Sequence, residues 1–212
     1  MLCAQPGRLF KGRQWMEISL ERKEGTAWRA VDPGLVLESG DLVRFRFRAN
    51  FDGYLYVINS GTSGEKSLLF PLEATGLNNH FSSLNTYHVP SNQGATFKVA
   101  GPPGHDIAYW LVSPTPLGNE LARTLMRDSP ERPPVSMTPR CDDKIFGARS
   151  RCIDSSAGPR NPSDDSLPES LQSIPDRTRR ELVIVQEKDG ARVSSPEPLS
   201  GPVIYEFHVA HR

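Results

Sequence analysis

The side chains best suited to metal or acid–base chemistry are five histidines spread along the chain. They are His80, His88, His105, His208 and His211. Imidazole and carboxylate groups bind several divalent cations. His80, His88 and His105, together with Asp106, are therefore a candidate set of metal ligands. Their spacing does not require a metal site, and we expect no bound metal and no other cofactor.

A second possible chemistry is a general base oriented by a carboxylate, which His105 and Asp106 suggest as neighbours. Neighbouring residues of a β-strand point to opposite faces, which argues against a dyad made by this pair. A small hydrolase that uses His88 or His105 with a nearby carboxylate remains the alternative to a non-catalytic function.

The chain has three cysteines, of which Cys141 and Cys152 lie in one Pro/Ser-rich stretch. They could close a short disulfide loop, which needs an oxidising compartment, or remain two free thiols. Without a scaffold to hold a base beside Cys141, a cysteine nucleophile is not expected there. The sequence also lacks a P-loop, a G-x-G-x-x-G turn, H-E-x-x-H, C-x-x-C and a G-x-S-x-G elbow, so no catalytic residue is assigned.

Charge and hydropathy exclude some partners. Lys and Arg number 25 and Asp and Glu number 25, so nothing favours a polyanion, and no nucleic-acid partner is expected. No apolar run approaches the length of a transmembrane helix, so no transmembrane segment is expected. The first five residues resemble the end of a signal peptide, which favours a periplasmic or secreted protein with a missing or truncated leader over a cytoplasmic one.

The elements that must position these residues are mostly strands. In residues 41–49, Val43, Phe45 and Phe47 alternate with three arginines, which predicts a strand with one buried and one solvated face. The arginine row could instead track phosphates, but a solvated face is the simpler interpretation. Residues 53–59 are apolar on both faces, which is typical of a strand covered on both sides. With Asp52-Gly53 as a hairpin turn, residues 44–70 are predicted to form a three-stranded meander.

Later segments complete one predicted domain. Residues 87–90 read as a short edge strand and 106–113 as a buried strand, while Thr115-Pro116 and the leucines after it predict a short helix to about residue 125. Residues 128–178 are predicted to be a disordered Pro/Ser-rich insertion. Two strands after it must pair back onto the earlier sheets. We therefore predict a flexible lead-in (1–13) and a single antiparallel, Ig-like β-sandwich (14–212) with one short helix.

Several motifs in order resemble a bacterial family of domains of unknown function, DUF4384. They are Ser39 to Phe45, Asp52-Gly53-Tyr54-Leu55-Tyr56-Val57-Ile58-Asn59, Leu68-Leu69-Phe70-Pro71, Tyr87 to Pro90 and Gly101 to Gly104. The resemblance covers about residues 38–113. The residues in the core of the motif are expected to determine the fold. Asp52 and Gly53 form a turn, Tyr54 and Tyr56 lie in a central strand, and Leu68 and Phe70 lie in a paired strand that Pro71 ends.

The resemblance carries no established activity or catalytic residue. Members of the family often occur in exported proteins or beside kinase-like or peptidase domains, which implies an accessory module. We therefore expect a non-enzymatic interaction module that binds a protein or a glycan through the loops at residues 60–64, 72–86 and 101–105. A purely structural spacer is the third reading, and neither the partner nor the oligomeric state follows from the sequence.

Overall fold

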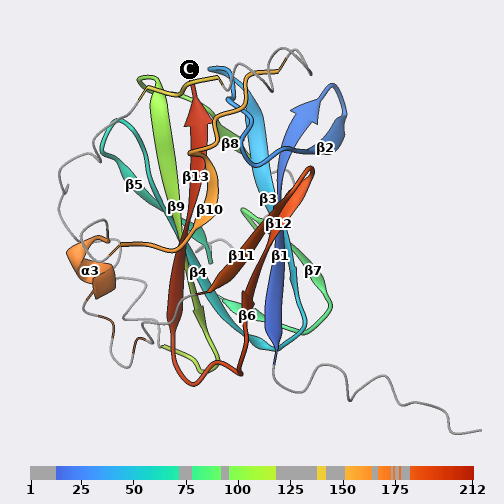
Figure 1. Cartoon of the computed structure of the whole chain (residues 1–212), viewed down its shortest axis with the longest axis vertical. Helices are drawn as coiled ribbons and strands as arrows, with labels where there is room; N and C mark the ends of the chain where they lie inside the picture. The colour runs from blue at the N-terminus through green and yellow to red at the C-terminus, as the bar shows by residue number, and fades with distance from the viewer. Residues whose placement is uncertain are drawn as a thin grey trace, which may run out of the picture.

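The structure, a computed structural model, is an antiparallel β-sandwich of two sheets (Figure 1). It describes residues 13–71, 78–91, 96–117, 138–141, 151–163, 167–172, 174, 177 and 182–212. The elements in chain order are β1 (Gln14–Glu24), β2 (Ala27–Val31), β3 (Leu42–Ala49), β4 (Gly53–Ser60), β5 (Lys66–Phe70), β6 (His80–Phe81), β7 (Thr86–Val89), β8 (Phe97–Lys98), β9 (Gly104–Ser113), β10 (Gly158–Arg160), α3 (Glu169–Gln172), β11 (Val183–Glu187), β12 (Gly190–Ser195) and β13 (Val203–His211).

One sheet has seven strands in the described part of the chain and one buried face. Its order is β11-β12-β1-β3-β7, with β2 paired to β1 and β8 paired to β3. In β3, Phe45 and Phe47 are buried, while the arginines between them point to the other face, as the alternation predicts. The predicted edge strand at residues 87–90 is also found, because among the described strands β7 pairs only with β3.

The other sheet has six described strands in the order β10-β13-β9-β4-β5, with β6 paired to β4. Its central strands are apolar on both faces. In β4, Leu55 and Val57 join the core between the sheets, whereas Tyr56 and Ile58 join a second apolar cluster on the outer face. This two-sided burial is what the sequence of residues 53–59 predicts.

Aromatic rings from both sheets meet in the core between them. Trp110 of β9 lies edge-on to Phe45 and Phe47 at 5.5 and 5.7 Å and stacks on Tyr205 of β13 at 5.8 Å between ring centroids. Such edge and offset contacts add to the stabilisation that comes from buried apolar area. The core thus links β3 of one sheet to β9 and β13 of the other.

The described parts of residues 128–178 are ordered, so the predicted disordered insertion is wrong for them. Ile153 is buried in the inner core, β10 pairs with β13, and Leu167, Leu171 and Ile174 cover the outer face of the six-stranded sheet. Sparse apolar residues are sufficient here because the sheet already presents an apolar surface for them to cover. The remaining residues of this stretch lie outside the described part.

The predicted helix near residues 115–125 is not seen where it can be checked. Thr115, Pro116 and Leu117 are not helical, and the residues after them lie outside the described part. The helix that the structure describes, α3, instead lies within the stretch that the composition marked as disordered.

The predicted meander is also wrong at its first turn, because β3 and β4 belong to different sheets. Within the predicted meander, the β4–β5 pair is a hairpin and the β3–β4 connection is not. A strand buried on one face and a strand buried on both faces suit different sheets, so the chain crosses the sandwich at Asp52-Gly53. Gly53 has no left-handed φ; a Cβ there would lie 2.8 Å from Phe81 Cζ and 2.9 Å from the Ser113 carbonyl oxygen.

The two ends of the described chain complete the sheets. β12 pairs with β1, and β13 pairs along its whole length with β9, so segments far apart in the sequence lie side by side (Figure 1). The strands after residue 178 therefore return to the earlier sheets, as predicted. They also include β12, a strand that the sequence pattern did not reveal.

Replacing Gly53 tests the close crossing between the sheets. We expect Gly53→Ala to lower the free energy of unfolding by about 1–3 kcal/mol, because the new methyl group overpacks against Phe81 and backbone. Urea unfolding measures this loss. Gly61→Ala is the matched control, since its Cβ would lie 3.3 Å from the flexible Glu65 side chain and at ordinary contact distance, 3.6 Å, from Asp106 Oδ1 and Ser63 Oγ. Equal losses in both variants would contradict this account of Gly53.

Truncating Leu171 tests the outer layer. Leu171 has a relative exposure of 1%. Leu171→Ala should therefore cost about 2–5 kcal/mol of unfolding free energy, as buried leucine truncations do. Val183→Ala, at an exposed valine of β11, is the control and should change stability by less than about 1 kcal/mol. If both variants unfold at the same urea concentration as the unaltered chain, the outer layer is not packed in solution.

Candidate functional site

The histidines proposed as a metal set do not converge. Within the described residues, no three His, Cys, Asp or Glu side chains are placed to hold a metal ion together. His80 packs edge-on to Tyr54, with ring centroids 5.3 Å apart. His88 lies opposite Arg46 in the neighbouring strand, and burial together with the charge of Arg44 lowers the pKa of its imidazole.

Two arginines of the row next to His88 form ion pairs within the sheet. Arg44 Nε and Arg46 Nε donate to the two oxygens of the buried Glu21 carboxylate at 2.7 and 2.9 Å. Arg44 also covers Trp28, with its guanidinium carbon 4.4 Å from the ring centroid.

His105 has a carboxylate partner, but the partner is Asp154 and not Asp106. His105 Nε2 lies 3.2 Å from Asp154 Oδ2 and 3.2 Å from Ser156 Oγ, while Ser156 Oγ donates to Asp154 Oδ1 at 2.5 Å. Asp106 binds other groups, as expected for neighbours on opposite faces of β9. The three residues therefore form a compact cluster of a histidine, an aspartate and a serine.

The geometry of this cluster is that of an anchor. In a serine hydrolase the serine and the carboxylate occupy opposite nitrogens of the histidine ring, so that a proton can pass between them. Here both lie at Nε2, and the Ser156 hydroxyl hydrogen is directed to the carboxylate. His105 is therefore not oriented to activate Ser156 as a nucleophile.

Hydrogen bonds make Asp154 a fixed anion. Burial alone would raise the pKa of its carboxyl group, but the Ser156 hydroxyl, the N–H groups of Arg140 and Ser156, and His105 together lower it. Arg140 precedes Cys141, whose disulfide to Cys152 has a sulfur–sulfur distance of 1.98 Å. Asp154 thus ties both arms of the disulfide loop to β9.

A second buried pair lies beside this cluster on β13. Glu206 Oε2 is 2.8 Å from His208 Nε2, and the rings of His105 and His208 are 6.3 Å apart. Burial lowers the pKa of His208, and the charges of Arg160 and His105 act in the same direction, while Glu206 opposes the shift. These five polar residues lie together beside β9 and β13, and the contacts of His105 with Asp154 and Ser156 join the disulfide loop to the six-stranded sheet.

The Asp106 carboxylate is held through one of its two oxygens only, within the described residues. Its Oδ1 accepts from the Thr62 N–H at 2.8 Å and lies 3.3 Å from Nε2 of His211. Oδ2 has no protein partner in the described part of the chain, and Asp106 lines a groove. The carboxylate is therefore fixed in orientation while one oxygen stays available to accept a further hydrogen bond.

This groove, which we call the edge groove, lies between the sheet edges formed by β5 and β8 and has a volume of about 280 Å³. Its floor is made of core side chains, including Val43, Phe45, Leu69 and Val209. Its polar lining contains one amide, several hydroxyl groups and three charged groups. These side chains are Asn59, Ser63, Ser67, Thr96, Glu65, Lys98 and Asp106. An apolar floor with a few converging polar groups is typical of a small-ligand site.

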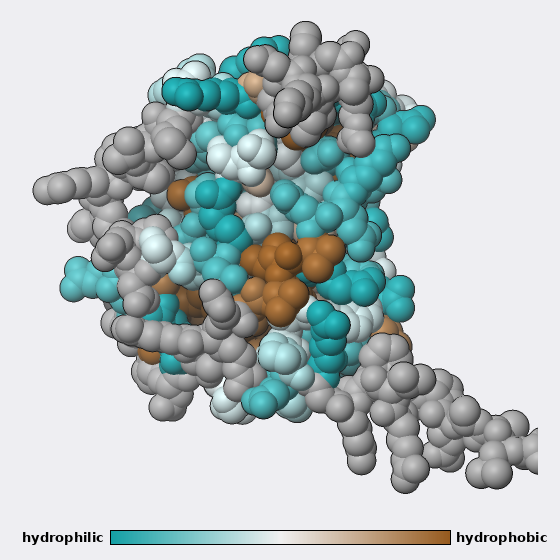
Figure 2. All heavy atoms as spheres, viewed as in Figure 1, coloured by the Kyte–Doolittle hydropathy of each residue, from teal (hydrophilic) through white to brown (hydrophobic). Residues whose placement is uncertain are grey.

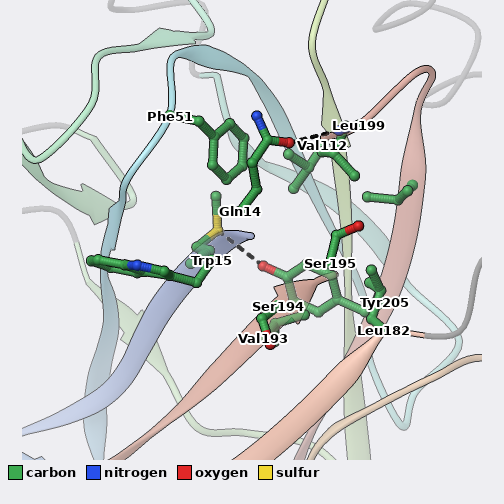
Figure 3. Close-up of a pocket in the computed structure, with 12 residues that line it drawn as sticks. Gln14, Trp15, Phe51, Val112, Leu182, Val193, Ser194, Ser195, Leu199 and Tyr205 are labelled. Atoms are coloured by element: carbon green, nitrogen blue, oxygen red, sulfur yellow. Dashed lines mark hydrogen bonds between the residues drawn. The ribbon is translucent and has the colours of Figure 1, made fainter. Parts of the chain in front are cut away.

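A concavity elsewhere in the sandwich is packed nearly shut. Figure 3 shows its lining around Gln14, Tyr205 and Leu199, with a remaining volume of about 20 Å³. The Tyr205 hydroxyl donates to the Met16 sulfur at 3.1 Å, and Gln14 Oε1 accepts from the Leu199 N–H at 2.7 Å. This space is sufficient for about one water molecule and not for a ligand.

Two further surfaces, both on the seven-stranded sheet, have fewer features of a ligand site than the edge groove. A polar groove of about 300 Å³ lies over β1 beside the β11–β12 turn, and ion pairs such as Arg192 with Glu17 occupy part of its lining. Apolar surface gathers near the middle of the face on which Figure 1 shows β11 (Figure 2). Val183 and Val185 of β11 are 46% and 47% exposed.

The predicted recognition loops contribute unequally to the edge groove. Gly61 and Ser63 of the 60–64 loop line it directly. The 101–105 loop packs against that turn, since a Cβ on Gly101 would lie 3.0 Å from Thr62 Oγ1. Of the 72–86 loop, residues 72–77 lie outside the described part.

The motif residues spread over the six-stranded sheet and do not form a site. Asp52 Oδ1 accepts from the Ser83 N–H at 2.7 Å, Tyr56 is buried under the outer layer, and Phe70 lies in the inner core before Pro71 ends β5. Leu68 packs against the outer cluster, and Tyr54 lies edge-on to His80.

Sequence reasoning missed Asp154 and Ser156, because they lie in the stretch predicted to be disordered. It also missed the groove-lining side chains of β5 and β8. The sequence does contain one indication of the groove: Asn59 and Ser67 stand at inward-facing positions of their strands, where the alternating pattern would otherwise place apolar residues.

Replacing Asp154 tests the anchor and its dependence on pH. The ordinary pKa is 3.8 and the folded value is lower, so the carboxylate stabilises the fold above that pH, and the contribution is lost as pH falls through the folded pKa. Asp154→Asn should cost about 1–3 kcal/mol of unfolding free energy at pH 7. The difference from the unaltered chain should shrink below about pH 4, measured by urea unfolding.

Asp189→Asn, in the turn between β11 and β12, serves as the control and should follow the unaltered chain at each pH. A constant difference between Asp154→Asn and the unaltered chain from neutral to acid pH would contradict the assignment of Asp154 as a buried, hydrogen-bonded anion.

Comparison with known proteins agrees with the resemblance found in the sequence. No curated protein and no solved structure matches the chain. The described residues contain no helix long and apolar enough to cross a membrane. Residues 36–116, which span β3 to β9, match the family model described as Domain of unknown function (DUF4384).

Proposed function

We propose that this protein is a non-catalytic recognition module that takes its ligand in the edge groove. The observation that carries the proposal is the combination of an apolar floor with a fixed carboxylate, Asp106, whose Oδ2 has no partner in the described residues. A preorganised acceptor costs little to bring into a complex, because its orientation is already set.

The proposed setting is an exported or envelope-associated bacterial protein in which this module serves an accessory role. The disulfide between Cys141 and Cys152 supports that setting, because disulfides persist in oxidising compartments. The ligand is a protein segment or a glycan, either of which suits a groove at the edge of a sandwich.

The alternative, a hydrolase with a His/carboxylate site, is weaker on the geometry. His105 does have a carboxylate partner, but Ser156 and Asp154 share one nitrogen of its ring. His88 lies near Glu21 and the two arginines that pair with it, Arg44 and Arg46. Neither arrangement aligns a base with a nucleophile.

Filling the groove tests the proposal. Ala100 is exposed and lines the groove, whereas Ala27 is exposed on β2 away from it, so Ala100→Trp and Ala27→Trp are matched variants. Thermal unfolding would be followed with a library of soluble saccharides and short peptides. A ligand should raise the melting temperature of the unaltered chain and of Ala27→Trp by a few degrees, and should not raise that of Ala100→Trp.

The same samples should contain the ligand unchanged by mass spectrometry after prolonged incubation. Consumption of the ligand would contradict a non-catalytic role. An equal rise in melting temperature for both tryptophan variants would place the ligand outside the edge groove and overturn the proposal.

A further inference from the structure

We infer that the edge groove binds a carbohydrate, with a ring hydroxyl donating to Oδ2 of Asp106 and the apolar face of the sugar lying on Phe97 and the groove floor. This inference rests on the proposed recognition function and names the ligand class of the same site. It follows from the donors and acceptors that the groove presents.

The first step is the demand that Asp106 places on a ligand. An ionised carboxylate only accepts hydrogen bonds, so a ligand at Oδ2 must bring an O–H or an N–H group. The Thr62 N–H and His211 hold the other oxygen, at 2.8 and 3.3 Å. Hydrogen bonds from hydroxyl groups to a carboxylate are among the stronger ones, so the interaction selects a hydroxylated or amino ligand.

The second step separates a hydroxylated ligand from a cationic one. The groove also contains Lys98 and Glu65, so the charges of Asp106 and Glu65 are partly offset by a lysine in the same lining. The remaining polar groups are neutral: the Asn59 amide and the hydroxyls of Ser63, Ser67 and Thr96. Amide and hydroxyl groups both donate and accept, as the hydroxyls of a neutral sugar do.

The third step concerns the apolar part of the groove. Phe97 is half-buried, with its ring 6.4 Å from that of Phe45, and both residues line the groove together with Val43 and Leu69. A pyranose ring has one face rich in C–H groups and a rim of hydroxyls. An apolar floor beside a rim of polar groups matches that division, whereas a purely apolar ligand would leave Asp106 desolvated without a donor.

The experiment measures binding of methyl glycosides of glucose, galactose, mannose and N-acetylglucosamine and of their short oligomers by titration calorimetry and NMR. Alkylammonium salts and short apolar peptides form the comparison series. We expect at least one saccharide to bind, with chemical-shift changes around Asp106 and Phe97. A deoxy or O-methyl derivative of that saccharide should bind several-fold more weakly.

Asp106→Asn should weaken saccharide binding at least tenfold, because the amide keeps the shape of the carboxyl group but loses its charge and replaces an acceptor with a donor. Asp189→Asn, an equivalent change at the β11–β12 turn, should leave the affinity unchanged. Thr96→Val removes one hydroxyl and Phe97→Leu removes the ring, and each should cost several-fold. Near-ultraviolet circular dichroism confirms that each variant keeps its packed core.

The possible failures are distinct. In the first, an ammonium salt or a peptide binds in the groove and Ala100→Trp blocks it, while no saccharide binds at millimolar concentrations. That result would overturn the carbohydrate inference and leave the recognition proposal standing. Saccharide binding that Asp106→Asn leaves intact would also overturn the inference. If no ligand from any series binds in the groove, both proposals fail.

Discussion

The structure depends on one constraint: the central strands of the six-stranded sheet are apolar on both faces. β9 contributes Trp110 and Val112 to the inner core and Tyr109 and Leu111 to the outer cluster. A sheet of this kind cannot leave either face in water, since each buried large apolar side chain contributes roughly 1.5–3 kcal/mol. It must be covered twice, once by the seven-stranded sheet and once by the segment that carries Leu167, Leu171 and Ile174.

That requirement explains why a Pro/Ser-rich stretch is partly ordered. The segment brings few apolar residues, but they meet a surface that is already fixed, and the disulfide and the Asp154 cluster hold their neighbours in place. Fewer contacts then suffice to offset the entropy of ordering the chain. The same constraint explains the crossing at Gly53, because after β3 the chain must leave the half-exposed sheet for the one that is covered on both faces, where β4 lies.

Local patterns in the sequence predicted which faces of individual strands are buried. The alternation in residues 43–48 and the two-sided run at 53–59 gave the correct burial of β3 and β4. What failed depends on distant partners. The Asp-Gly pair has the composition of a hairpin turn. The strands on either side of it nevertheless belong to different sheets, because one is covered on one face and the other on both faces. β12 is small and polar, and it is a strand because β1 and β11 pair with its two edges. Asp154 and Ser156 acquire their role only through His105, some fifty residues earlier.

The location of the edge groove follows from how the two ends of this sandwich are filled. Around Met16 and Tyr205 the side chains of both sheets meet, and a space of only about 20 Å³ is left. At the β5 and β8 edges, the described strand β8 has two residues, and small or polar side chains such as Ser67 and Asn59 stand where large apolar ones would close the gap. A core that is left unfilled loses contacts and therefore stability. A chain that places serine, threonine and a fixed carboxylate over such a gap keeps a partly hydrated groove, and a ligand that supplies both an apolar face and hydroxyl donors recovers the missing contacts.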